Sequence, residues 1–145
     1  MVADTQHIKN KQSGFTLIEL LVAIVILAIG LSAAATMQAV ALDSNAIANR
    51  VSVSSFLAQQ VAEELSSRNI ADPLFKTNSS GTYQFVDWST GAQQLVNSLT
   101  IPGAGTFTAS YTIQANTFNG ASFPGMTEIQ VMVNNVTYTT YKMVN

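Results

Sequence analysis

The fold is decided by residues 14–31, which read GFTLIELLVAIVILAIGL. This stretch is apolar apart from Thr16, Glu19 and two glycines, and no charged residue follows Glu19 until Asp43. A helix over residues 15–42 would be about 42 Å long, whereas the hydrocarbon core of a bilayer is ~30 Å thick. The stretch therefore predicts a helix that can span a membrane.

The composition argues against a soluble enzyme. The chain has 145 residues, of which 10% are charged, whereas an ordinary soluble protein carries roughly 25%. It has no cysteine, which excludes thiolate metal sites and disulfides. Its single histidine, His7, lies near the N-terminus, so a Ser-His-Asp triad would depend on that one residue. A net charge of −2 argues against nucleic acid as a partner. We therefore expect no enzymatic activity, no cofactor and no metal.

A helical pattern continues beyond the apolar stretch, over residues 43–68. One side of that helix would carry Ile47, Val51, Leu57, Ala58, Val61 and Leu65. Val53 and Phe56 would point to the opposite side, where they would lie under a loop or contact another subunit. No proline precedes Pro73, so a single helix is expected from residue 15 to about residue 68.

The remainder, residues 69–145, is rich in Ser, Thr, Asn and Gly and predicts short strands joined by turns. The expected strands are residues 83–86, 107–113, 129–133 and 136–143. Turns are expected at residues 102–105, 119–120 and 134–135, and the last of these would join two strands in a hairpin. The expected fold class is α+β, with one long N-terminal helix packed on a small antiparallel sheet.

Glu19 is the awkward residue of the apolar stretch. A carboxylate at membrane depth is costly unless it is paired or neutral, so such a residue is a functional candidate by default. The simpler interpretation is that Glu19 only complements the positive end of the helix dipole. The run GFTLIE and the apolar residues after it resemble the cleavage junction of type IV pilin precursors, and the resemblance extends over residues 9–42.

This resemblance implies how the chain is processed and where it goes. A prepilin peptidase would cut after Gly14, Phe15 would become the N-methylated terminus, and Glu19 would set the axial register of the subunit in a filament. Residues 1–14 would then be the leader peptide. The protein would cross the inner membrane once, with its N-terminus cytoplasmic, before joining an extracellular pilus. Its partners would be the peptidase, other major and minor pilins, the pilus assembly platform and membrane lipid.

A finer resemblance points to PilV-type minor pilins, through the runs ILAIGL at 26–31, MQA at 37–39 and NAIANR at 45–50. The helix-disrupting proline and the C-terminal disulfide of many major pilins have no counterpart in this chain. Two alternatives stay open. One is a minor pseudopilin of a type II secretion system, and the other is a secreted β-domain binding protein with a classical signal peptide cut near residues 32–35. Calcium bound by Asp72, Asp87 and loop carbonyls also stays open.

Overall fold

The computed structural model describes residues 14–87, 89 and 91–144. Its elements are one α-helix, a short 3₁₀ helix and nine strands within these residues. The chain divides into two compact units, Met1–Leu42 and Asp43–Asn145, and the helix α1 (Leu17–Ser67) contributes to both. One long apolar helix followed by antiparallel sheet confirms the expected α+β class. The predicted leader, apart from Gly14, lies outside the described residues.

The elements after α1 all belong to the second unit. They are η1 (Pro73–Phe75), β1 (Ser79–Tyr83), β2 (Phe85–Asp87), β3 (Gln94–Val96), β4 (Ser98–Ile101), β5 (Gly105–Gln114), β6 (Thr117–Phe118), β7 (Ala121–Ser122), β8 (Met126–Val133) and β9 (Val136–Met143).

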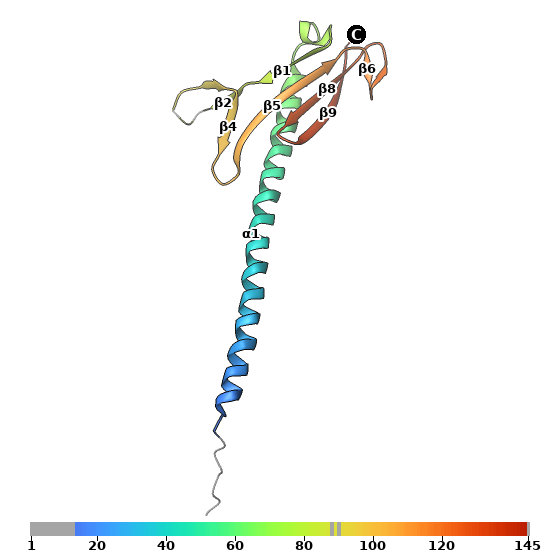
Figure 1. Ribbon diagram of the computed structural model, residues 1–145. Coiled ribbons are helices and arrows are strands. Elements are labelled where there is room, and N and C mark those ends of the chain that lie inside the picture. Colours follow the sequence, from blue (N-terminus) through green and yellow to red (C-terminus); the bar gives the residue numbers. More distant parts are fainter. Residues whose placement is uncertain (1–13, 88, 90, 145) are drawn as a thin grey trace, which may run out of the picture. The chain divides into compact units, whose positions relative to one another are not determined.

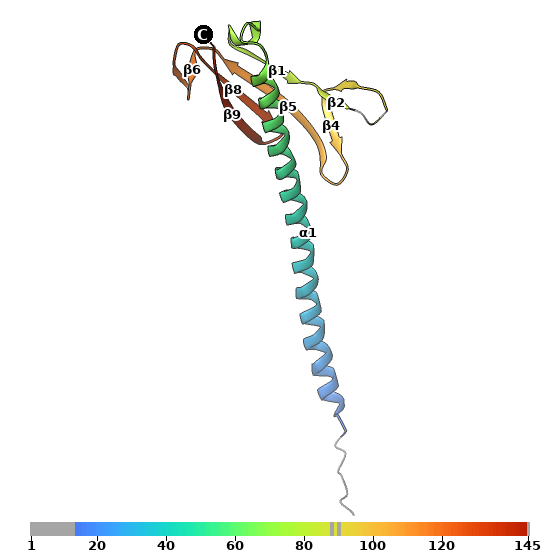
Figure 2. The ribbon, with the colours of Figure 1, turned by 180° about the vertical axis from the view of Figure 1, so that it is seen from behind.

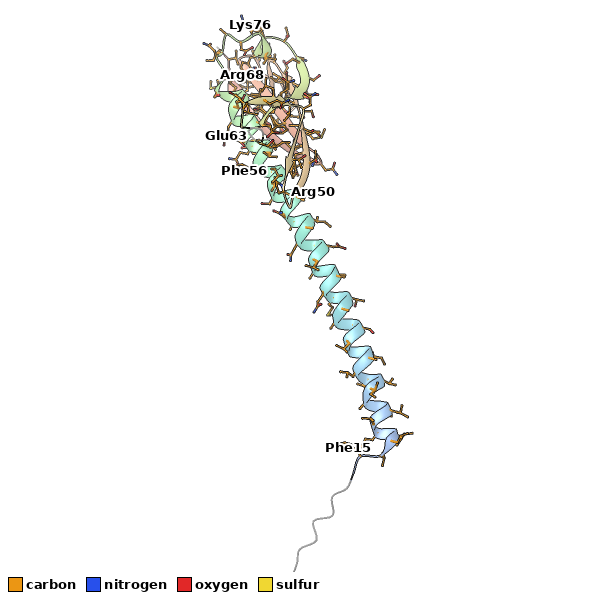
Figure 3. All side chains as sticks on the ribbon, turned by 90° about the vertical axis from the view of Figure 1, so that its left-hand side faces the viewer. Phe15, Arg50, Phe56, Glu63, Arg68 and Lys76 are labelled. Carbon is orange, nitrogen blue, oxygen red and sulfur yellow. The ribbon has the colours of Figure 1, made fainter. Side chains whose placement is uncertain are left out.

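The first unit contains the N-terminal part of α1. Every described side chain from Gly14 to Leu42 is exposed in the single chain, including large apolar ones such as Leu20, Ile24 and Leu31. Figure 3 shows these side chains projecting from the helix all along this segment. Among the described residues, α1 is the one helix long and apolar enough to cross a membrane. Such a surface needs lipid or protein around it, because contiguous apolar area of this size is unfavourable in water.

The second unit is organised around β5. The main sheet has the order β1-β5-β8-β9. β4 and β1 share one edge of β5, where β4 pairs with residues 105–108 and β1 pairs with residues 109–113. All these pairs are antiparallel. Figures 1 and 2 show the strands β5, β8 and β9 lying beside the last turns of α1. The two small sheets, β2-β3 and β6-β7, are hairpins outside this main sheet.

The core lies between one side of α1 and one face of the main sheet. Residues three or four apart share that side of the helix, and alternate residues of each strand share that face of the sheet. The buried apolar side chains of these elements are Leu57, Ala58, Val61, Ala62 and Leu65 from α1, Phe107, Ala109 and Ile113 from β5, and Ile129, Val131 and Val133 from β8. Phe75 of η1, Phe85 of β2 and Ala104, in the turn between β4 and β5, complete the cluster. The alternating positions of β5, such as Thr108, are exposed or half-buried.

The apolar side of α1 that the sequence predicts, from Ile47 to Leu65, is buried only in its C-terminal part, from Leu57 onward. Ile47 and Val51 are 65% and 50% exposed, although their angular position on the helix matches that of the buried residues. Val53 is half-buried and packs against the core, so its predicted position on the opposite side is wrong. It lies one turn before Leu57, and the sheet covers an arc wide enough to include it. Phe56 is 65% exposed, and Figure 3 shows it on the surface of the helix.

The predicted turns are confirmed. Val133 pairs with Val136, so residues 134–135 form a two-residue hairpin loop, and Asn134 takes the left-handed conformation with φ 51°. Asn119 and Gly120, with φ 52° and 75°, join β6 to β7 in the same way. Asparagine tolerates this conformation better than other residues with a side chain, which is why both turns are readable from sequence.

The predicted strand at residues 83–86 is instead the junction of two strands. β1 ends at Tyr83 and β2 begins at Phe85. β1 starts earlier, at Ser79, and includes Gly81, which pairs with Tyr111 of β5. A Cβ at Gly81 would lie 2.8 Å from the Tyr111 hydroxyl oxygen, so the tyrosine ring occupies the space that any side chain would need.

Candidate functional site

The first turn of α1 is closed by a side-chain cap. The Oγ1 of Thr16 accepts a hydrogen bond from the N–H of Glu19 at 3.3 Å, and the Thr16 carbonyl accepts one from the N–H of Leu20 at 3.2 Å. These are the two contacts of an N-cap residue. Thr16 and Glu19 stand in the T-x-x-E spacing of a capping box, a sequence signal that points to Thr16 as well as to Glu19.

Gly14 and Phe15 precede the helix, which begins at Leu17. Phe15 is 86% exposed, and Figure 3 shows it at the start of α1. A Cβ built on Gly14 would meet no atom within 4 Å. The described fold therefore does not require a glycine at position 14.

Glu19 lies in the first turn of α1, where the helix dipole favours a negative charge. Within the described part of the chain it makes no ion pair. The three residues singled out by sequence, Gly14, Phe15 and Glu19, thus lie at one helix end together with Thr16. The arrangement offers an accessible peptide bond, a capped helix start and a carboxylate without a cation among the described residues.

The three acidic residues that follow α1, Asp72, Asp87 and Glu128, have local structural roles. Asp72 accepts a hydrogen bond from the N–H of Leu74 at 3.0 Å and caps η1. Asp87 accepts one from the N–H of Ser89 at 2.8 Å. The buried carboxylate of Glu128 accepts from the N–H of Gly120 at 3.1 Å and from the side chain of Gln130 at 2.7 Å.

These carboxylates are not brought together. Among the residues that the structure describes, no three histidine, aspartate or glutamate side chains gather in a group that could hold a metal ion. Two carboxylates flanking one bond, as acid–base catalysis requires, are also not found in the contacts of Asp72, Asp87 and Glu128. The proposal of bound calcium gains no support from their positions.

A cleft of about 450 Å³ lies between the end of α1 and the strands β1 and β2. Its polar lining is a connected set, in which the Tyr83 hydroxyl donates to Glu64 and Glu64 lies 3.9 Å from Arg68. The pKa of Tyr83 is raised to about 12, first by burial and then by the hydrogen bond to Glu64. The hydroxyl therefore keeps its proton to a higher pH than an ordinary tyrosine does, and it donates that proton in the hydrogen bond to Glu64.

The comparisons with known proteins point to the N-terminal site. Residues 9–35 match the family model described as the prokaryotic N-terminal methylation motif, a range that includes Gly14, Phe15, Thr16 and Glu19. Neither the comparison with curated proteins nor that with solved structures found a match. The motif supports a type IV pilin or pseudopilin that is a substrate of prepilin peptidase. Together with the apolar helix it fits anchoring in the inner membrane before assembly, and it suggests a structural protein rather than an enzyme.

Proposed function

We propose that this chain is a minor type IV pilin, which is cut after Gly14, methylated on Phe15, and then incorporated into a pilus filament or used to prime its assembly. The observation that carries the proposal is the methylation motif over residues 9–35, directly followed by an apolar helix whose side chains are exposed along its length. The motif supplies the processing step, and the helix supplies the surface that a filament would bury.

Hydrolysis of the Gly14–Phe15 bond would change the charge at the start of α1. Water adds across the bond, leaving a carboxylate on Gly14 and an amine on Phe15, which a methyl donor then methylates. The new cation would lie about one helical turn from the Glu19 carboxylate. Pairing of the two, within one chain or between neighbouring chains, would offset part of the cost of placing either charge in an apolar environment.

Assembly would then transfer one helix from lipid to protein. The exposed apolar residues of the first unit, Leu20 and Ile24 among them, would be surrounded by lipid tails before assembly and by other helices afterwards. Since the apolar surface is covered in both states, the transfer costs little hydrophobic free energy. Within this scheme Glu19 fixes the axial position of the subunit, because a misplaced carboxylate would lack its cation.

Two features favour an accessory subunit over the bulk subunit. α1 is continuous from Leu17 to Ser67 and contains no proline, and the chain has no cysteine to close a C-terminal loop. Both features set the chain apart from many major pilins and agree with the PilV-type resemblance of its N-terminal half. A minor pseudopilin of a type II secretion system shares these features and is the second candidate.

Intact-mass spectrometry of the protein from membranes and from sheared filaments tests the proposal. We expect a chain that begins at Phe15 with one added methyl group, present in both fractions. The Gly14→Leu variant should keep its leader, because the peptidase site needs a small residue there. Gly30→Leu is the matched control, since a Cβ at Gly30 also meets no atom within 4 Å, and it should be processed normally.

Three outcomes would contradict the proposal or redirect it. A mature chain that begins within or just after residues 32–35 would establish a classical signal peptide and a secreted head. Normal processing of Gly14→Leu would contradict the prepilin assignment. A methylated chain found with type II secretion components and not in pili would favour the pseudopilin.

A further inference from the structure

We propose that Thr16 is a positioning residue for the cleavage, and that its capping hydrogen bond keeps the Gly14–Phe15 bond outside the helix, where a peptidase can reach it. This inference rests on the proposed function and adds a role for a residue that the processing scheme leaves without one. Thr16 would act on the chain's own backbone, through the place where α1 begins, and not as a ligand of the peptidase.

The contacts of Thr16 define that place. Its carbonyl accepts from the N–H of Leu20 in the first helical bond, while its Oγ1 accepts from the N–H of Glu19. An N-cap residue has non-helical backbone angles, so the helix stops there and residues further upstream lie outside it. The described structure agrees, because Gly14 and Phe15 are outside the helix that begins at Leu17.

A helix that began one turn earlier would hide the bond. The Gly14 carbonyl would then accept a hydrogen bond from the N–H of Ile18, and its carbon would lie within the helical turn, away from an attacking nucleophile. In the described structure Gly14 and Phe15 instead precede the helix, which begins at Leu17, and Phe15 is 86% exposed. The cap thus places a boundary between Gly14–Phe15, which the peptidase must reach, and α1, which must be stable in lipid.

The sequence offers a substitute cap if Thr16 is changed. Apolar surroundings make unpaired N–H groups costly, so a helix that loses its cap either frays or extends to the next capping side chain. The nearest upstream residue of a capping type is Ser13. A helix that started after Ser13 would include Gly14 and Phe15, and alanine at position 16 would favour that extension because it is the strongest helix former.

The test measures the cleavage rate of the full chain in membrane vesicles by a prepilin peptidase, with four variants. Thr16→Ala removes the cap, Thr16→Val removes the hydroxyl but keeps the shape, and Thr16→Ser keeps the cap but removes the methyl group. We expect cleavage of the alanine and valine variants to be about fivefold slower, and cleavage of the serine variant to match the unchanged chain. Adding Ser13→Ala to Thr16→Ala removes the substitute cap and should restore part of the rate.

The outcomes separate this inference from the proposed function. If the unchanged chain is not cut after Gly14, the proposed function fails. If it is cut there and the alanine and valine variants are cut equally fast, the role of Thr16 is wrong and the function stands. Slow cleavage of the serine variant would also overturn the inference, because it would mean that the peptidase contacts the methyl group. Resistance of each variant to alkaline extraction from the vesicles controls for membrane insertion.

Discussion

At the scale of single residues, Tyr83 shows how burial and a carboxylate near the end of α1 raise the pKa of a side chain. Burial, the hydrogen bond to Glu64 and the charge of that carboxylate raise the pKa of Tyr83 from 10.0 to about 12, and Arg68 acts in the opposite direction. The folded protein therefore holds this proton more tightly than the unfolded chain does. The resulting stabilisation is fully present below pH 10 and is lost as the pH rises to about 12.

We predict that the Tyr83→Phe variant lacks this loss. The full shift would correspond to about 2.7 kcal/mol, and solvent screening at this partly exposed position reduces it to about 1 kcal/mol. Between pH 10 and 12, the free energy of unfolding of the unchanged protein in detergent should fall by about that much more than that of the variant. Urea titrations followed by circular dichroism measure the difference. Tyr138→Phe, which keeps Tyr83, should follow the unchanged protein, and parallel curves for all three proteins would contradict the prediction.

At the scale of elements, α1 depends on β9 for the closure of its C-terminal end. The last turn of α1 contains no basic residue, although its final carbonyls lack helical partners and carry the negative end of the dipole. Lys142 of β9 supplies the cation, because its Nζ donates to the carbonyls of Ser66 and Arg68. The same Nζ lies 4.6 Å from the centre of the Phe75 ring, so η1 joins the contact.

We predict that Lys142→Met lowers the free energy of unfolding by about 2 kcal/mol, because methionine keeps the apolar stem but removes the charged donor. Hydrogen exchange should be faster at the end of α1 and in η1, with smaller changes in β5 and β8. Lys76→Met is the matched control, since Lys76 is exposed and the only hydrogen bond described at this residue is made by its backbone N–H. Equal loss of stability in both variants would mean that the contact of Lys142 contributes nothing specific.

Across the whole molecule, the features that can be predicted from the sequence are those set by residues close together in the chain, whereas contacts between distant segments cannot be predicted in this way. The hairpin of β8 and β9 follows from strand alternation and an Asn-Asn turn, and the N-terminal site is a contiguous run of residues. The place of Gly81 within β1 involves Tyr111 of β5, which pairs with it and fills the space above it from another strand. The exposure of Ile47 depends on where the sheet ends along α1, which a helical wheel does not contain. The cap of Thr16 is also local and is signalled by the T-x-x-E spacing, although it is not among the expectations drawn from the sequence.

In assembly, the charge of Glu19 can be separated from the contribution that its side chain could make to a capping box. Glu19→Gln removes the charge, but glutamine at this position can still take part in a capping box, whereas Glu19→Ala removes both functions. We expect both variants to be processed largely normally and to be depleted at least about tenfold in sheared filaments relative to membranes, because the amine of Phe15 loses its anion in an apolar environment. Quantitative immunoblots of the two fractions measure this ratio, with Glu63→Gln as the control for loss of an exposed carboxylate. Normal incorporation of Glu19→Gln with loss of Glu19→Ala would assign the requirement to the helix cap, and normal incorporation of both would show that Glu19 does not set the register.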